Sequence, residues 1–342
     1  MSNGSHVAIV GATGAVGTEL IQLLEQREFP VRELKLLATP KSAGKVLKFK
    51  GEDIRVETLS DSSFKRVDTA LFSAGGSTSR EYAKFAAGAG AVVIDNSSAF
   101  RMEADVPLVV PEINPADIQK HRGIIANPNC TTIIALMALY PLHLAFRVKR
   151  VIASSYQAVS GAGAKAIHEL SVQSKSFCSG EPVSPEVFPH PIAFNVLPQV
   201  DIFLDGGYTK EEQKFVNESR KIMHHPTFRA SITCVRVPVF RAHSVAVNAE
   251  FEQPVSIDRA RDALKNFEGL ELVDDPSSNK YPMPISAAGK DKCQVGRLRV
   301  DSAWDNGLAF WVCGDQLLKG AALNAVQIAE LAYEIRRSQG VR

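Results

Sequence analysis

The 342-residue sequence predicts an α/β fold in which a doubly wound parallel sheet is joined to a second, α+β domain. Short apolar strands at 6–10, 68–72 and 91–94 alternate with helical segments, a pattern typical of parallel sheets with right-handed crossovers. A glycine-rich turn directly follows the first strand and opens a helix. After Pro141 the alternation gives way to longer strands and irregular connections, which indicates a second domain.

The first turn reads Gly11-Ala-Thr-Gly14-Ala-Val-Gly17, and the helix after it carries Leu20, Leu23 and Leu24 on one face. Glycines there let the backbone approach a pyrophosphate, which binds at the helix N-terminus. We therefore predict a Rossmann-type dinucleotide domain, an ordinary tight turn being the alternative. The residues expected to contact the cofactor are Gly11, Thr13, Gly14, Ala15, Val16 and Gly17.

The second strand, 34–38, ends without the acidic residue that usually binds the ribose of NAD. Thr39, Lys41 and Ser42 follow instead, and hydroxyls with a cation suit a 2′-phosphate. The sequence thus favours NADP, with a solvated surface lysine as the alternative.

Polar residues follow the later strands where they end. Ser73 and Gly75, the segment 95–98, the loop with Arg101, and Asn129 with Cys130 all take such positions. Ligands of open parallel sheets bind off the carboxyl ends of the strands, so we expect the chemistry here and assign Ser73 and Gly75 to the cofactor.

Cys130 stands between a short strand, 124–126, and an apolar helix that should end before Pro141. At a helix N-terminus, unpaired N–H groups and the helix dipole favour the reactive thiolate. This pattern points to a nucleophile, although an unpaired cysteine can equally be a small buried hydrophobe.

The second domain offers polar residues that each have a structural alternative. Gln157 opens a small-residue loop, and Thr209-Lys-Glu-Glu212 is a capping box for a helix bearing Glu218 and Lys221, a pair that alone suggests a surface salt bridge. His243 lies between predicted strands 231–239 and 244–251 and could be purely structural. The long excursion 177–208 indicates an interface or a lid.

Composition excludes several classes of protein. The net charge of +2 argues against nucleic-acid or membrane-surface partners, and five scattered cysteines without a Cys-x-x-Cys pair indicate neither a disulfide framework nor a metal site. No apolar run of about 18 residues and no leader are evident. A reducing, cytoplasmic location is expected; a transit peptide already removed, as for the plastid stroma, would leave no trace.

Together these motifs closely resemble the aspartate-semialdehyde dehydrogenase family along nearly the whole chain. The resemblance rests, in order, on the glycine turn 11–17, Ala126-Asn-Pro-Asn-Cys-Thr-Thr132, Gln157 with Ser160-Gly-Ala-Gly163, Glu218-x-x-Lys221, Arg236 followed seven residues later by His243, and Lys319-Gly-Ala-Ala-Leu-Asn324. It implies an NADPH-dependent reduction of L-aspartyl 4-phosphate to L-aspartate 4-semialdehyde through a cysteine thioester, in the synthesis of lysine, methionine, threonine and isoleucine.

The resemblance also implies a role for each matched residue. Cys130 is the expected nucleophile, His243 the acid/base and Gln157 the group that orients the acyl intermediate. Arg236 would bind the substrate carboxylate and Glu218 its amine, while Arg101, Asn129 and Lys221 would hold the phosphoryl group. The resemblance adds Ser160 and Gly161 as substrate contacts and Gly163 and Asn324 as cofactor contacts.

For the domain organisation we expect 1–130 plus 319–342 to bind NADP and 131–318 to serve catalysis and dimerisation. The expected assembly is a homodimer, with a homotetramer as the alternative. Two other functions stay open: N-acetyl-γ-glutamyl-phosphate reductase, which Asn129 and Glu218 disfavour, and a non-catalytic NADP-binding regulator, which leaves the set Gln157, Arg236 and His243 unexplained.

Overall fold

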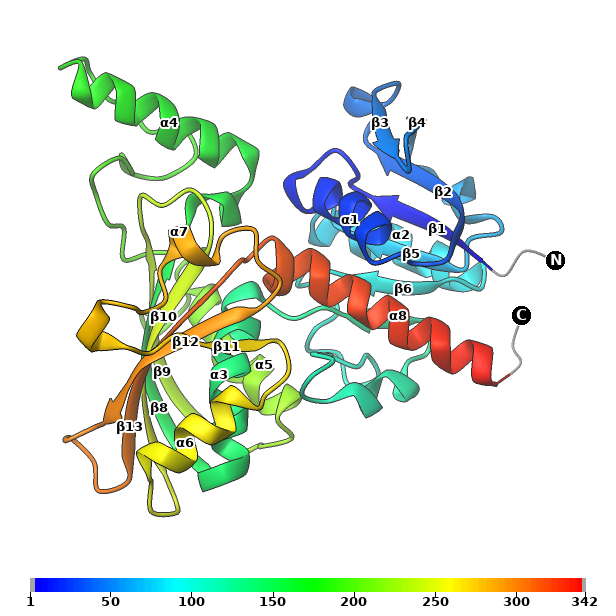
Figure 1. Ribbon diagram of the computed structural model, residues 1–342. Coiled ribbons are helices and arrows are strands. Elements are labelled where there is room, and N and C mark those ends of the chain that lie inside the picture. Colours follow the sequence, from blue (N-terminus) through cyan, green and yellow to red (C-terminus); the bar gives the residue numbers. More distant parts are fainter. Residues whose placement is uncertain (1–3, 340–342) are drawn as a thin grey trace. The chain divides into compact units, whose positions relative to one another are not determined.

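The computed structural model describes residues 4–339, which divide into two compact units (Figure 1). The first contains the described residues up to Asn129 and those from Ala321 onward, and the second is Cys130–Gly320. Within residues 4–339, no helix combines the length and the apolar character needed to cross a membrane.

The first unit is built on a seven-stranded sheet in the order β3-β4-β2-β1-β5-β6-β7. All neighbouring strands pair in parallel except β3 and β4, which form an antiparallel hairpin. The strands are β1 Ser5–Val10, β2 Val31–Ala38, β3 Val46–Phe49, β4 Glu52–Thr58, β5 Thr69–Phe72, β6 Val92–Asp95 and β7 Ile124–Ala126. The predicted doubly wound sheet is confirmed.

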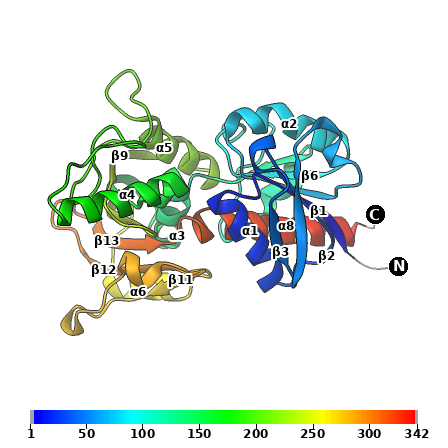
Figure 2. The same ribbon diagram turned by 90° about the horizontal axis from the view of Figure 1, so that it is seen from above.

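Helices cover both faces of this sheet. In both views α1 (Ala15–Gln26) and α8 (Leu323–Ser338) lie on one face and α2 (Gly76–Gly88) lies on the other (Figures 1 and 2). Arg27, just after α1, donates from Nε to Oε1 of Glu330 on α8 at 2.7 Å. Short 3-10 turns, Pro40–Ser42, Asp61–Phe64 and Pro115–Lys120, complete the unit.

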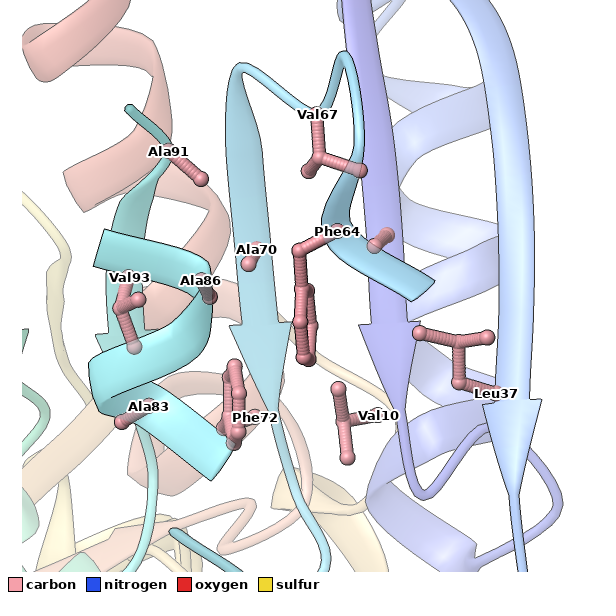
Figure 3. Close-up of a cluster of buried hydrophobic side chains, with 11 residues drawn as sticks. Val10, Leu37, Phe64, Val67, Ala70, Phe72, Ala83, Ala86, Ala91 and Val93 are labelled. Carbon is pink, nitrogen blue, oxygen red and sulfur yellow. The ribbon is translucent and has the colours of Figure 1, made fainter. Parts of the chain in front are cut away.

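An apolar core fills the space between α2 and the strands (Figure 3). Phe64 and Phe72 stack there with ring centroids 5.8 Å apart, and Val10, Leu37 and Val93 are fully buried around them. Burial of this kind, about 25 cal/mol per Å² of apolar surface, fixes the carboxyl ends of β1, β2 and β5. The loops predicted to bind cofactor begin at those ends.

The second unit has a six-stranded sheet in the order β11-β12-β13-β10-β8-β9. Helices α3, α5 and α6 pack on one face of it (Figure 1). The strands are β8 Val148–Gln157, β9 Arg229–Arg236, β10 His243–Phe251, β11 Leu270–Leu272, β12 Cys293–Val300 and β13 Gly307–Gly314. The helices are α3 Cys130–Phe146, α4 Ala164–Cys178, α5 Lys210–Ile222, α6 Ile257–Lys265 and α7 Pro284–Ala287, with 3-10 turns at Val159–Ala162 and Pro276–Ser278.

Helix α3 does not end before Pro141 as the sequence predicted. It runs through Pro141 to Phe146 and is buried on almost every side. An interior proline costs a helix about 3 kcal/mol, but burial of Leu142 and Phe146, both 0% exposed, returns about 1.5–3 kcal/mol each. Burial therefore outweighs the missing backbone hydrogen bond.

One other predicted boundary was wrong. Strand β9 ends at Arg236 rather than at residue 239, because Pro238 cannot donate a hydrogen bond to the sheet. The last α-helix begins at Leu323, after a π-helical turn over Leu318–Ala322. Such turns occur often at functional sites.

Candidate active site

Cys130 is the first residue of α3, as predicted, and its side chain is partly exposed. The π-helical turn before α8 brings Gly320 against it: a Cβ on Gly320 would lie 2.9 Å from the Cβ of Cys130. Only glycine leaves room there. The sequence motif contained Gly320, but nothing in the sequence indicated this contact.

The backbone of Ala158 joins three of the predicted site residues. Gln157, its neighbour, ends β8 opposite Arg236 of β9. The Ala158 carbonyl accepts a hydrogen bond from Arg236 Nη1 at 2.7 Å, and the Ala158 N–H donates to His243 Nδ1 at 3.1 Å. The second unit therefore brings Gln157, Arg236 and His243 together.

His243 is fully buried at the start of β10, and its Nε2 has no hydrogen-bond partner within residues 4–339. Because Nδ1 accepts from a backbone N–H, the proton of the neutral ring is on Nε2. Burial, followed by the charge of Arg236, lowers the pKa of His243 well below its usual value. The ring is thus a neutral donor with one unused N–H.

Arg236 is 6% exposed, and its guanidinium contacts the neutral Ala158 carbonyl and the ring of Phe188, whose centroid is 5.8 Å away. Burial lowers the pKa of Arg236, while the charges of Glu211 and Cys130 act in the opposite direction. A buried guanidinium whose hydrogen bond goes to a carbonyl suits a carboxylate ligand.

Glu211 belongs to this cluster although the sequence analysis did not select it. Its Oε1 accepts from Gln157 Nε2 at 3.4 Å, and the residue is 6% exposed in the first turn of α5. Glu211 and Lys214 repeat the spacing of Glu218 and Lys221 one heptad earlier. That repeat was the signal available in the sequence.

Glu218 lies on the same face of α5 as Glu211, two turns and about 10 Å further along the helix. It is 1% exposed, so the alternative interpretation of Glu218 and Lys221 as a surface salt bridge was wrong. Glu218 falls on the apolar stripe with Phe215 and Ile222, and this position was the signal of its burial that the sequence contained.

The loop after β8 packs tightly against the cluster. A Cβ on Gly161 would lie 3.0 Å from Arg236 Nη1 and 3.2 Å from His243 Nε2. The Ser160 hydroxyl accepts a hydrogen bond from Gln316, whose Oε1 accepts from the N–H of Ala242 at 2.8 Å. Gln316 is therefore a second contributor that the sequence analysis did not select.

The first unit holds Arg101, Asn129 and Asn324. Arg101 is 7% exposed and donates to the carbonyls of Asn127 at 2.9 Å and Asn96 at 2.8 Å, which places it at the carboxyl ends of β6 and β7. Asn129 directly precedes Cys130 in the chain. Asn324 is fully buried and donates to Asn127 Oδ1 at 2.7 Å, so its side chain holds the connection between β7 and α3 that precedes Cys130. Contact of Asn324 with the cofactor stays a prediction.

The glycine turn of the first unit has the close packing that a dinucleotide site needs. Gly11 has a φ of +85°, and a Cβ there would lie 2.4 Å from the carbonyl of Ser73. A Cβ on Gly17 would lie 2.2 Å from the Gly11 carbonyl. The turn therefore lies between the ends of β1 and β5 and leads into the N-terminus of α1, the position at which dinucleotide-binding folds hold a pyrophosphate.

The other predicted cofactor residues lie on loops. Thr39, just before the 3-10 turn after β2, and Lys41, within that turn, are exposed, and Gly75, with a φ of +87°, precedes the first residue of α2. Gly163, with a φ of +93°, precedes α4 in the second unit. Thr13, Ala15, Val16, Ser42 and Ser73 are partly exposed, and Gly14 is exposed. No cluster of metal-ligating side chains occurs among residues 4–339.

Comparison with known proteins gives the family. Residues 6–121 match the model "Semialdehyde dehydrogenase, NAD binding domain", and residues 139–319 match "Semialdehyde dehydrogenase, dimerisation domain". Aspartate-semialdehyde dehydrogenase of Aquifex aeolicus is 54% identical over 96% of this chain and 98% of its own, and that of Synechocystis is 52% identical over 98% and 99%. The structure of aspartate semialdehyde dehydrogenase II from Vibrio cholerae, complexed with ASA, has a TM-score of 0.95 at 46% identity, covering 97% of this chain and 99% of that one.

Proposed function

Because this chain belongs to the aspartate-semialdehyde dehydrogenase family, we propose that it reduces L-aspartyl 4-phosphate to L-aspartate 4-semialdehyde with NADPH. The observation that carries the proposal is the cluster of Gln157, Arg236 and His243 around Ala158, in the same unit as a cysteine at a helix N-terminus. The reaction supplies the aldehyde from which lysine, methionine, threonine and isoleucine are made.

Cys130 is the group that attacks the substrate. Its thiolate forms a C–S bond with the acyl carbon as the bond from that carbon to the phosphate oxygen breaks, which gives a thioester and free phosphate. NADPH, when bound, supplies the hydride that reduces the thioester. The C–S bond then breaks and releases the aldehyde and the thiolate.

His243 serves this chemistry through Nε2. The neutral ring carries its proton there, on the nitrogen that has no partner among the described residues. It can donate a hydrogen bond to the substrate oxygen as negative charge develops on it. Gln157, buried and tied to Ser155 and Glu211, is placed to orient the acyl group.

Substrate recognition needs an anion and a cation partner for the amine and the carboxylate of aspartate. Arg236 supplies the fork for the carboxylate. For the amine we favour Glu211 over Glu218. The Oε1 of Glu211 lies 3.4 Å from Gln157 Nε2, and the charge of Glu211 acts to raise the pKa of Arg236. Lys214 accordingly replaces Lys221 as the proposed phosphoryl-binding lysine, alongside Arg101 and Asn129.

For the cofactor we propose NADP rather than NAD. The turn Gly11–Gly17 fits a pyrophosphate, and Thr39, Lys41 and Ser42 offer hydroxyls and a cation to the 2′-phosphate. As the assembly we propose a homodimer through the second unit, a homotetramer being the alternative. We propose the cytoplasm as location, since a reducing compartment keeps a reactive thiol free; the plastid stroma is the alternative.

The experiment that tests this function measures NADPH formation from aspartate semialdehyde, NADP and phosphate, and the reverse rate with aspartyl phosphate and with N-acetyl-γ-glutamyl phosphate. We expect strong preference for the aspartyl substrates. Cys130→Ala should keep less than about a thousandth of the rate while still binding NADPH. Comparable rates on both acyl phosphates would instead support the N-acetyl-γ-glutamyl-phosphate reductase.

The choice between the two carboxylates has its own test. Glu211→Gln should raise the KM for aspartate semialdehyde by about 10-fold or more, because a charge-assisted hydrogen bond to the ammonium contributes roughly 1.5–3 kcal/mol. Glu218→Gln, an equally buried position on the same helix, is the matched control and should change that KM less than about threefold. The opposite ranking would return the role to Glu218 and Lys221.

A further inference from the structure

The ammonium group of Lys214 is held between two carboxylates. Its Nζ lies 2.8 Å from Oδ2 of Asp201 and 3.0 Å from Oε2 of Glu211. The side chain of Lys214 is only 18% exposed, against 31% for Asp201 and 7% for Glu211. Asp201 is thus the outer and more accessible partner of a largely buried cation.

Asp201 comes from the irregular segment between α4 and α5 and is fixed there by its neighbours. On one side, Leu197 and Arg236 exchange backbone hydrogen bonds of 2.9 and 2.8 Å. On the other side, the N–H of Lys210 donates to the carbonyl of Ile202 at 2.8 Å. Asp201 itself has a φ of +69°, and its Oδ1 accepts from the N–H of Ile202 at 2.9 Å. The loop thus presents the remaining oxygen, Oδ2, to Lys214.

The charges in this triad oppose the binding of a phosphoryl group. One ammonium and two carboxylates sum to −1. Burial would raise the pKa of Asp201, but hydrogen bonds from Lys214 and from Ile202 outweigh it and lower that pKa. Burial would likewise lower the pKa of Lys214, but Glu211 and Asp201 raise it. Asp201 and Lys214 are therefore both charged near neutral pH.

A phosphate that approached Lys214 would be repelled by the carboxylates beside it unless one of them withdrew. Glu211 is fixed in the first turn of α5 and bonded to Gln157, whereas Asp201 is on a loop and more exposed. Asp201 is the partner that can leave. When Asp201 is in place it neutralises the charge of Lys214, and when it has left, the phosphate neutralises that charge instead.

We propose that Asp201 is a resident anion that occupies Lys214 in the empty enzyme and is displaced by the phosphoryl oxygens of the substrate. This inference rests on the proposed role of Lys214 in the function above. Asp201 is a positioning residue that holds the lysine in place before substrate binds. Because Asp201 competes with phosphate for Lys214, the apparent phosphate affinity is reduced in proportion to the fraction of molecules in which Lys214 is free of Asp201.

The test is the KM for inorganic phosphate in the oxidative direction, with aspartate semialdehyde and NADP saturating. Asp201→Asn keeps the size of the side chain but removes the competing charge, so we expect the phosphate KM to fall by about 3- to 10-fold. Asp201→Glu should stay within about twofold of wild type. Asp205→Asn, which neutralises an exposed carboxylate of the same segment, is the matched control and should change nothing. An unchanged or raised phosphate KM in Asp201→Asn overturns the inference, because a merely structural anchor would move the KM upward or not at all.

Lys214→Met separates failure of this inference from failure of the proposed function. If it leaves the phosphate KM unchanged, Lys214 does not bind phosphate and its assignment fails. If it raises that KM while Asp201→Asn does not lower it, only the inference about Asp201 fails.

A measurement on the wild-type protein guards against an Asp201 variant that does not fold. Saturating phosphate, with NADP present, should speed hydrogen–deuterium exchange in residues 198–205, because the loop loses its anchor on Lys214. Unchanged or slower exchange in that segment would show that Asp201 stays on the lysine and would reject the proposal.

Discussion

At the scale of single residues, backbone groups and glycines position the reactive side chains of the second unit. The Ala158 backbone fixes both Arg236 and His243, and Gly320 leaves room for Cys130. Because a catalytic group misplaced by about 1 Å can lose about 100-fold in rate, these small residues contribute to activity through geometry.

Gly161 offers the sharpest test of that geometry. Its missing Cβ would lie 3.0 Å from Arg236 and 3.2 Å from His243, so Gly161→Ala must displace one of them. We expect kcat/KM to fall by about 10- to 100-fold with the free energy of unfolding reduced by no more than about 1–3 kcal/mol. Gly88→Ala, where a Cβ meets nothing within 4 Å, is the control. A fully active Gly161→Ala would mean that the loop moves aside freely.

Lys41 carries the prediction on cofactor choice. It is exposed in the 3-10 turn after β2, next to Thr39 and Ser42. We expect kcat/KM to favour NADP over NAD in the wild type, and Lys41→Ala to reduce that preference by about 3- to 10-fold, since the hydroxyls keep part of the contact. Steady-state kinetics with both cofactors measure it; equal values in the wild type would contradict the assignment.

At the scale of elements, α3 links the nucleophile to a histidine pair at its other end. His143 Nδ1 accepts from the N–H of Val148 at 3.2 Å, and its ring lies 5.3 Å from that of His225. Burial, then the charges of His225 and Arg147, lowers the pKa of His143. The folded protein thus prefers this ring neutral.

That preference makes stability depend on pH in a definite direction. A histidine with a lowered folded pKa binds fewer protons in the folded than in the unfolded state, so its contribution is present above pH about 6.5 and is lost as pH falls through and below that value. Between pH 7.5 and pH 5.5, urea unfolding should show that the free energy of unfolding decreases less in His143→Asn than in the wild type. The Oδ1 of the asparagine can still accept the hydrogen bond from the N–H of Val148. Equal losses would assign the pH dependence to other groups.

At the scale of the whole molecule, the sheet of the second unit has one face covered by helices and one that exposes apolar side chains. On β8, Ile152 is 54% exposed and Tyr156, four residues further along the same face of the strand, is 37% exposed. Apolar side chains gathered on an uncovered face mark interaction sites, and the matching family model describes residues 139–319 as a dimerisation domain. This face is therefore our candidate for the dimer contact.

Sedimentation of Ile152→Glu tests the location of the contact. The wild type should sediment as a dimer of the 37.1 kDa chain, and the variant should dissociate at least about 10-fold more readily, because a charge buried in an interface is strongly unfavourable. Leu144→Glu, at a side chain 63% exposed on α3, is the control on the helical side. An unaffected dimer in Ile152→Glu would place the contact elsewhere.

The sequence by itself determined the fold class, the family, the enzyme activity and the helix start at Cys130, all of which are confirmed, because alternation of strands and helices, glycine turns and helix starts are local properties of the chain. The tertiary structure decided which of two similar Glu-x-x-Lys pairs meets Gln157. Helical periodicity puts Glu211 and Glu218 on one face, and only the packing of α5 against β9 selects the first. The contacts of Gln316 with Ser160 and of Gly320 with Cys130 also required the structure, since each joins residues far apart in the chain. No local pattern predicts the π-helical turn that contains Gly320.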